Sequence, residues 1–236
     1  TSATLSANRF TFLQNVRCSR AHRYPYTMST TPRLPVIGIV GGIGSGKSEV
    51  ARMLAEVGCV VCDSDSLVRK TLREPVIKEE LVRWWGPTIL DAHGDINRKA
   101  VAHLVFASTE DRQRLEQLIH PRVEALRHEI FAAAPSTTPA LIIDAPLLLE
   151  AGLGPKCDRI WFIDTPLATR LERVQRTRGW SAHDLQRRES AQWPLDRKRS
   201  AAHDVLRNEG DSASLQRQVL QVLRDLPPVT STESKL

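Results

Sequence analysis

The sequence contains no apolar run that approaches the roughly 20 residues a membrane-spanning helix requires. Its four cysteines do not indicate a disulfide framework, because two of them, Cys59 and Cys62, lie in the apolar run CVVC. A strand points residues i and i+3 to opposite faces, so we expect these thiols to be buried on different sides of a sheet, without a shared metal. Reduced thiols are typical of the cytosol, and we predict a cytoplasmic protein without membrane association.

Acidic residues are absent from residues 1–27, which carry four arginines and so account for most of the net charge of +6. A nucleic-acid-binding protein usually concentrates its basic surplus on the folded part, so we expect no nucleic-acid partner. The Ser, Thr and Arg content of this segment suits a transit peptide, whereas Met28 also fits a start immediately before the domain. Both interpretations stay open, and in either case we expect residues 1–33 to be a disordered extension.

Five short apolar runs predict β-strands, and segments with helical periodicity lie between them. Strands that alternate with helices indicate an α/β fold with a five-stranded parallel sheet covered by helices on both faces. Residues 66–133 interrupt this alternation with helical pieces and no convincing strand, which predicts a helical insertion. We expect the domain to span 34–228 and a disordered tail to occupy 229–236. The expected strands are 35–40, 59–62, 140–144, 159–163 and 203–206, and the clearest helices are 47–57, 166–177 and 211–225.

The stretch GGIGSGKSE, residues 41–49, matches the phosphate-binding pattern G-x-x-x-x-G-K-[ST] between an expected strand and an expected helix. Its glycines let backbone N–H groups face phosphate oxygens, and the following helix directs its positive dipole end at the anion. We expect Lys47 to reach the β- and γ-phosphates and the Ser48 hydroxyl to bind Mg²⁺. The loop predicts a site for ATP or GTP made by Gly42, Ile43, Gly44, Ser45, Gly46, Lys47, Ser48 and Glu49.

A GTPase is disfavoured, because the guanine-reading pattern N-K-x-D is absent from the chain. The segment DAHG, from Asp91 to Gly94, matches the pattern D-x-x-G of GTPases but follows no expected strand. We therefore expect a simple turn at this position.

Two carboxylates follow the second expected strand in the segment CDSDSLVR. Ligands of doubly wound sheets bind beyond the carboxyl ends of the strands, and residues i and i+2 share one face while the chain is extended. One of Asp63 and Asp65 is therefore suited to take a proton from an acceptor hydroxyl and the other to organise Mg²⁺, although either also suits a helix cap. We expect Arg69 to pair with Asp65 or with a substrate phosphate. Asp144, which ends the third strand, is a candidate Mg²⁺ ligand, although it equally suits a cap for the next helix.

The segments IVGGIGSGKSEVARMLAEVGCVVCDSDSLVRKTL, WWGPTILDAHGDINRKAVAHLVF, LEQLIHPRVEA, DAPLLLEAG and HDVLRNEG together resemble the dephospho-coenzyme A kinases in order and spacing, over residues 36–225. The resemblance implies a P-loop kinase fold with a helical substrate-binding subdomain at 66–133 and an arginine-bearing lid at 172–198. It also implies transfer of the γ-phosphoryl group of ATP to the ribose 3′-hydroxyl of dephospho-CoA, with Mg²⁺. The alternatives are another small-metabolite or nucleotide kinase of this fold and a P-loop regulatory ATPase. We expect a monomer or small homo-oligomer.

The resemblance also assigns roles to individual residues. It makes Asp65 the general base and places Asn208, in the segment RNEG, against adenine. His120 precedes Pro121, so we expect it at a turn that opens a helix. The substrate site implied by the resemblance comprises Asp63, Asp65, Arg69, His120, Pro146 and Leu147.

The lid departs from the family pattern R-x-x-x-R followed by a small residue and Gly. In RVQRTRGW, Arg173 is followed by Thr177 at the second position, with Arg176 and Arg178 on either side of it. Positions two apart on a helix differ by about 200° in direction, so we expect only one of these two arginines to face the phosphates. Arg170 also stands where the family usually has Gln. The candidate catalytic residues are therefore Lys47, Asp65, Arg176 and Arg178.

Overall fold

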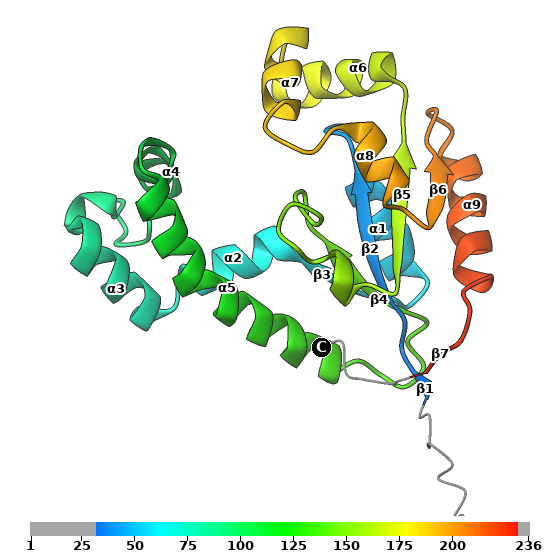
Figure 1. The fold of residues 1–236 in the computed structure, drawn as a ribbon, viewed down its shortest axis with the longest axis horizontal. Helices are drawn as coiled ribbons and strands as arrows, with labels where there is room; N and C mark the ends of the chain where they lie inside the picture. Colours follow the sequence, from blue (N-terminus) through cyan, green and yellow to red (C-terminus); the bar gives the residue numbers. More distant parts are fainter. Residues whose placement is uncertain (1–31, 231–236) are drawn as a thin grey trace, which may run out of the picture. The chain divides into compact units, whose positions relative to one another are not determined.

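The central sheet of the protein is parallel and has the strand order β3–β4–β2–β5–β6. The structure is a computed structural model that describes residues 32–230 (Figure 1). The predicted α/β fold is confirmed, and each of the five predicted strands is found within one residue of its expected ends. The strands are β2 (Val36–Gly41), β3 (Val60–Asp63), β4 (Leu141–Asp144), β5 (Arg159–Asp164) and β6 (Asp204–Arg207).

One face of the sheet packs against α1 (Lys47–Glu56) and α9 (Ser212–Arg224). Leu54 of α1, Val219 of α9 and Trp161 of β5 are fully buried in the cluster between these layers. Burial of side chains of this size stabilises the fold by about 1.5–3 kcal/mol each relative to leaving them exposed. This packing fixes α1, whose first residue is Lys47, against the strand that precedes the glycine-rich loop.

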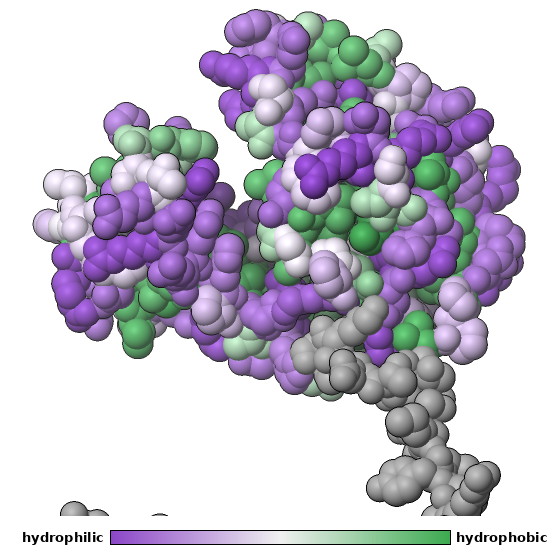
Figure 2. Space-filling view, viewed as in Figure 1, coloured by the Kyte–Doolittle hydropathy of each residue, from purple (hydrophilic) through white to green (hydrophobic). Residues whose placement is uncertain are grey.

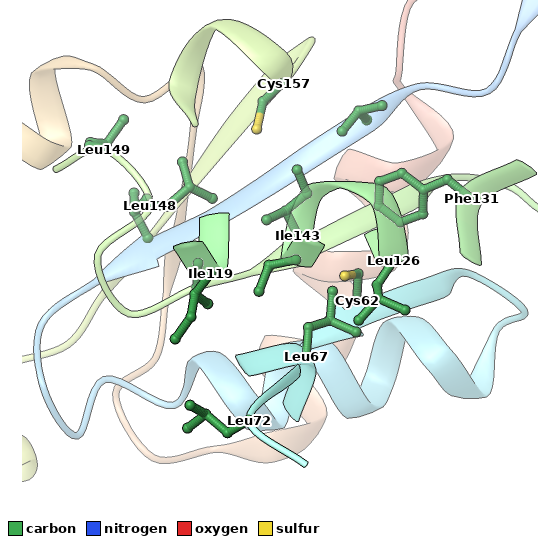
Figure 3. Packing of buried hydrophobic residues seen from close by; sticks show 14 of the residues in the cluster. Cys62, Leu67, Leu72, Ile119, Leu126, Phe131, Ile143, Leu148, Leu149 and Cys157 are labelled. Carbon is green, nitrogen blue, oxygen red and sulfur yellow. The ribbon is translucent and has the colours of Figure 1, made fainter. Parts of the chain in front are cut away.

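The opposite face packs against α2 (Ser64–Thr71) and the long helix α5 (Thr109–Ala132). Figure 3 shows Leu67 of α2, Leu126 of α5 and Ile143 of β4 among the side chains of this cluster. Helices therefore cover both faces of the sheet, as predicted.

The two cysteines of the CVVC run are buried on opposite faces of the sheet, as predicted. Cys59 belongs to the cluster on the α1 side, and Cys62 to the cluster on the α5 side. Burial raises the pKa of the Cys59 thiol to about 11 and also raises the pKa of Cys62. Within residues 32–230, no group of three or more His, Cys, Asp or Glu side chains is arranged to hold a metal ion.

The helical insertion follows β3 and also contains α3, α4 and the short η1 helix. At Asp91–Gly94 the chain forms the predicted turn, in which the Gly94 N–H donates to the Asp91 carbonyl at 3.0 Å. Figure 2 shows mostly hydrophilic residues over the insertion, although Val76 and Phe106 are exposed at 75% and 89%. In the part of the chain that the structure describes, no helix is long and apolar enough to cross a membrane. The remaining elements of the insertion are α3 (Pro75–Trp85), η1 (Pro87–Ile89) and α4 (Arg98–Ala107).

Helix α5 continues through Pro121, so the predicted turn at His120 is wrong. Proline removes one intrahelical hydrogen bond and its ring normally kinks or ends a helix. Here Ile119 and Val123, on either side of the proline, are both buried in the core, and their packing holds the helix together. His120 is exposed within α5.

Three further helices occupy and flank the predicted lid region between β5 and β6. Helix α6 ends at Gly179, which adopts a left-handed φ of 67°, and α7 begins with a capping box between Ser181 and Asp184. This short connection fixes the angle between the two helices. Their bounds are α6 (Leu167–Arg178), α7 (Ala182–Glu189) and α8 (Leu195–Ser200), and the short helix η2 (Gly154–Lys156) precedes β5.

The ends of the described chain meet in a small second sheet, where β1 (Pro32–Arg33) pairs antiparallel with β7 (Val229–Thr230). The Arg33 guanidinium donates to both carboxylate oxygens of Asp158 at 2.7 and 2.6 Å. These two strands extend the described structure by two residues beyond each predicted domain limit, 34 and 228. Strands of two residues leave no periodic pattern, so only the tertiary pairing identifies them. The rest of the predicted extension and tail lies outside the described residues.

Candidate active site

A cavity of about 1110 Å³ lies at the carboxyl ends of β2, β3 and β4. The strand order reverses at β2, the position where doubly wound sheets bind ligands. Gly42, His120 and Leu147 do not line this cavity, and Gly42 instead faces a smaller hollow of about 160 Å³ behind the loop. The predicted residues that do line it are Ile43, Gly44, Ser45, Gly46, Lys47, Ser48, Glu49, Asp63, Asp65, Arg69, Asp144, Pro146, Arg176, Arg178 and Asn208.

The glycine-rich loop adopts a conformation that requires glycine at two positions. Gly44 and Gly46 have φ values of 77° and 94°, in the left-handed region that side chains with a Cβ rarely adopt. A Cβ at Gly46 would also lie 2.3 Å from Nδ2 of Asn208. The loop leads directly into α1, whose N-terminal N–H groups and dipole favour an anion in the cavity.

Three side chains converge on the backbone carbonyl of Ser45. Thr165 Oγ1 donates to it at 2.9 Å, Asn208 Nδ2 at 2.8 Å and an Arg173 nitrogen at 3.4 Å. Arg173 also donates to Asn208 Oδ1 at 3.0 Å. Asn208 therefore supports the loop through both its carboxamide oxygen and its nitrogen, and its predicted contact with adenine stays a prediction.

A second brace holds Ile43 from the lid region. The carboxylate of Glu189 accepts a hydrogen bond from the Ile43 N–H at 3.1 Å and forms an ion pair with Arg170. Arg170 also donates to the Ile43 carbonyl at 3.4 Å and is only 4% exposed. Arg170 thus holds the loop and is not available as a lid cation.

Lys47 lies within the loop with its charge only partly compensated. Its Nζ donates to the carbonyls of Gly41 and Gly42 at 3.1 and 2.9 Å. Burial lowers the pKa of Lys47 to about 8 despite the opposing charge of Asp144, and the charges of Lys198 and Arg178 lower it further. A phosphate in the cavity would favour the charged form of this lysine.

On the acceptor side, Asp63 caps helix α2. Its carboxylate accepts from the Asp65 N–H at 3.0 Å and pairs with Arg69 at 3.3 Å, so the expected Arg69–Asp65 pair is not formed. The expectation that both carboxylates share the face of an extended strand is also wrong, because β3 ends at Asp63 and α2 begins at Ser64. Across residues 32–230, no hydrogen-bond or ion-pair partner is found for the Asp65 carboxylate. Asp65 is therefore available to a ligand.

Asp144 lies beside Asp63 because β3 and β4 pair these two residues in parallel register. Burial raises the pKa of Asp144, Lys47 counteracts this, and the charges of Asp63 and Asp65 raise the pKa again. The exposed Ser48 hydroxyl lies in the same cavity. These oxygen donors fit Mg²⁺, which usually takes one or two carboxylates together with substrate phosphates and water.

Both candidate lid arginines line the cavity, and the expectation that only one of them faces the phosphates stays a prediction. Arg178 is the last residue of α6, where the chain leaves the helix, and its guanidinium lies 4.7 Å from the ring centroid of Trp180. Arg176 is paired with Glu172 at 4.0 Å. Of these two arginines, only Arg178 contributes a charge that lowers the pKa of Lys47.

Comparison with known proteins agrees with this geometry. The sequence profile of the family described as dephospho-CoA kinase matches residues 35–214. The chain belongs to the dephospho-CoA kinase family. Membership of this family makes it an ATP-dependent kinase, and the resemblance seen in the sequence is confirmed.

Relatives match across most of their own length. The dephospho-CoA kinases of Synechococcus sp. (strain CC9605) and Geobacter metallireducens are each 37% identical to this chain, covering 81% and 80% of it and 93% and 96% of the relatives. The crystal structure of TT1252 from Thermus thermophilus superposes with a TM-score of 0.72 at 36% identity, covering 83% of this chain and all of that one. Dephospho-CoA kinase from Campylobacter jejuni shares the fold, with a TM-score of 0.55 at 20% identity over 80% of this chain and 96% of that one.

The sequence patterns missed several residues that line the cavity. Ala51 and Ala55 lie one turn apart on α1, a spacing that could have suggested a shared face toward a ligand. Gln192, between α7 and α8, belongs to no motif and no periodic pattern, so nothing in its local sequence indicated it. The other unpredicted lining residues are Arg52, Val61, Arg173, Thr177, Gly210, Ser212 and Leu215.

Proposed function

We propose that this protein transfers the γ-phosphoryl group of ATP to the ribose 3′-hydroxyl of dephospho-CoA, giving CoA and ADP in the last step of CoA biosynthesis. One observation carries the proposal: in a chain of this family, the unpaired Asp65 carboxylate lies in the same cavity as a braced phosphate-binding loop. The loop supports a nucleoside triphosphate as donor, and the carboxylate supports a hydroxyl as acceptor.

On the donor side, Lys47 and the N–H groups at the start of α1 bind the β- and γ-phosphates in this proposal. Arg178 lines the cavity at the end of α6, and its charge helps to lower the pKa of Lys47. In the transition state, negative charge builds up on the transferred phosphoryl oxygens and on the leaving ADP. Cations that are already in place stabilise that charge without reorganisation.

On the acceptor side, Asp65 acts as the general base. The bond from the ribose 3′-oxygen to the γ-phosphorus forms while the bond between that phosphorus and the β–γ bridging oxygen breaks. The hydroxyl proton passes to the Asp65 carboxylate, and the bridging oxygen leaves with ADP. Asp63 caps α2 and pairs with Arg69. Its hydrogen bond with the Asp65 N–H keeps Asp65 close to the end of β3.

Ser48 and Asp144 would hold Mg²⁺ together with phosphate oxygens. The ion supplies charge neutralisation on the β- and γ-phosphates when bound. Asp144 suits this task because the charges of Asp63 and Asp65 act on it, and an added cation relieves the repulsion among these three carboxylates.

The remaining parts of the proposal concern whole segments. Residues 66–133 form the coenzyme-binding subdomain, with Arg69 at the cavity and His120 as a further substrate-side residue. Pro146, which follows β4, lines the same cavity. Residues 172–198 form the lid. The buried thiols of Cys59 and Cys62 support a cytoplasmic location, and we keep a monomer or small homo-oligomer as the expected state.

The direct test is ADP formation from ATP with and without dephospho-CoA, each with and without Mg²⁺, and mass analysis of the product. We expect ADP to form only when all three are present, together with a product heavier than dephospho-CoA by one phosphoryl group. A panel of hydroxyl acceptors, including shikimate, gluconate and nucleosides, tests the rival kinase activities. Slow hydrolysis that dephospho-CoA does not stimulate would instead support a regulatory ATPase.

A further inference from the structure

Gln192 lines the active cavity from the connection between α7 and α8. Helix α8, which follows this connection, packs against β2, the strand that precedes the glycine-rich loop. The side chain is half-buried, and its Oε1 accepts a hydrogen bond from Lys198 Nζ at 2.9 Å. Within residues 32–230, the side-chain nitrogen of Gln192 donates to no protein acceptor.

Lys198 is a buried ammonium held by a small polar cluster. It is only 1% exposed, and its Nζ lies 2.9 Å from a carboxylate oxygen of Glu150. The same oxygen of Glu150 accepts from the Trp193 N–H at 2.8 Å, which fixes the residue that follows Gln192. Burying an ammonium costs several kcal/mol unless it is paired and hydrogen-bonded, so this cluster holds Lys198 in one place.

The chemistry of lysine determines which way the carboxamide of Gln192 points. An ammonium group has three donors and no acceptor, so it accepts no hydrogen bond from the carboxamide nitrogen. The oxygen of Gln192 must therefore face Lys198, and its two N–H donors are left for the cavity. A neutral donor pair that faces a phosphate site has the character of an oxyanion-binding group.

The position of the cluster indicates which ligand oxygen these donors meet. The charge of Lys198 is close enough to Lys47 to lower the pKa of that lysine. Lys47 marks the end of the cavity where the β- and γ-phosphates bind in kinases with this loop. The Gln192 carboxamide therefore lies toward the phosphoryl end of the cavity.

We infer that Gln192 is a further catalytic residue, whose N–H groups donate to an oxygen of the transferred phosphoryl group, and that Lys198 is the positioning residue that orients it. This inference rests on the proposed function. It adds a neutral donor from the α7–α8 connection to the cations of the loop and of the lid.

The test uses the full-length protein with the variants Gln192→Leu and Gln192→Glu. Leucine keeps the bulk and removes the donors, so we expect kcat to fall roughly 10- to 100-fold while both KM values change much less. Glutamate still accepts from Lys198, so Gln192→Glu should keep the wild-type Tm or raise it while kcat falls at least as far. Gln216→Glu is the matched control, because Gln216 is exposed on α9, outside the lid, and does not line the cavity.

The role of Lys198 is tested by removing the buried pair together, in Lys198→Met/Glu150→Leu, so that no unpaired charge remains. We expect kcat to fall as in Gln192→Leu, and the pair change to have no further effect on kcat in the Gln192→Leu background. Additive losses would assign Lys198 a merely structural role and overturn its part of the inference.

Two results would overturn the role of Gln192: kcat of both single variants within about twofold of wild type, or an increase of the KM for ATP alone. Both results count against Gln192 only when the wild-type enzyme phosphorylates dephospho-CoA in the same assay. An inactive wild type would instead overturn the proposed function.

Discussion

The donor and acceptor sides of the cavity differ in how many of their polar groups are fixed by hydrogen bonds and ion pairs within the protein. On the donor side, Thr165, Arg173 and Asn208 converge on one loop carbonyl, and Arg170 with Glu189 holds the next turn of the loop. On the acceptor side, Asp63 and Arg69 hold each other, and the Asp65 carboxylate has no partner among the described residues.

This difference follows from what each side must bind. A triphosphate presents the same charges in every catalytic cycle, so groups fixed in advance stabilise it without reorganisation. A general base, by contrast, has to approach a hydroxyl that arrives with the acceptor, and a carboxylate already committed to an arginine would be a weaker base. The structure thus separates a preformed donor site from an acceptor site that the substrate completes.

The largest effect is expected from Lys47→Ala, which removes the charge inside the loop. No other side chain donates to the carbonyls of Gly41 and Gly42, within the part of the chain described, and so none replaces it. We expect turnover to fall by about 10³-fold with an unchanged Tm. Turnover close to wild type would show that the loop is not the donor site. Lys70→Ala, an exposed lysine of α2 outside the cavity, is the matched control.

The two lid arginines sharpen the comparison, because only one of them acts on the charge of Lys47. Arg178→Ala should lower turnover by about 10²-fold, the scale of a lost transition-state cation, and Arg176→Ala should lower it much less. The reason is that the charge of Arg178 reaches Lys47, whereas Arg176 is paired with Glu172. Steady-state kinetics of the two variants, side by side, decides between them. Equal small effects would move the role to Arg173.

The side chains that hold the Ser45 carbonyl should affect nucleotide binding and not acceptor binding. Asn208→Ala removes a donor to the Ser45 carbonyl and the partner of Arg173, so we expect the KM for ATP to rise about tenfold with an unchanged KM for dephospho-CoA. Thr165→Val removes one donor of similar size and should have a smaller effect in the same direction. A change in the acceptor KM alone would contradict the separation of the two sides.

The smallest effect is a dependence of nucleotide affinity on pH. The folded protein lowers the pKa of Lys47 to about 8, and bound phosphates raise it again, so ATP binding takes up a proton as pH rises through 8. Between about pH 7.5 and 8.5 the charged fraction falls about threefold, and ATP affinity should fall with it. Calorimetry in two buffers of different ionisation enthalpy measures the uptake. Its persistence in Lys47→Met would assign it to another group.

Most of the fold could be predicted from the sequence, because strands such as β2 and the helix α1 depend on local apolar periodicity. The donor loop could be predicted for the same reason, since its glycines and Lys47 form one short continuous motif. Asp65 was found by its place directly after a strand. Each of these features depends on neighbours in the chain.

The features that were not predicted depend on residues far apart in the chain. The role of Arg170 in holding the loop depends on its ion pair with Glu189. The unbroken helix at Pro121 depends on the core that surrounds it. The arrangement of Gln192 depends on Lys198 and Glu150, which meet it only in the folded state. Local pattern carries no information about such pairs.

The most direct test of the separation into a donor side and an acceptor side is Asp65→Asn, examined by calorimetry and by turnover in one preparation. Asparagine keeps the size of the side chain but accepts no proton, so binding of ATP and of dephospho-CoA should survive while turnover falls by about 10²-fold or more. Asp63→Asn, its matched control, should have a milder effect on turnover. Loss of turnover in Asp63→Asn with normal turnover in Asp65→Asn would reverse the two assignments. Normal turnover in both variants would contradict the acceptor site itself.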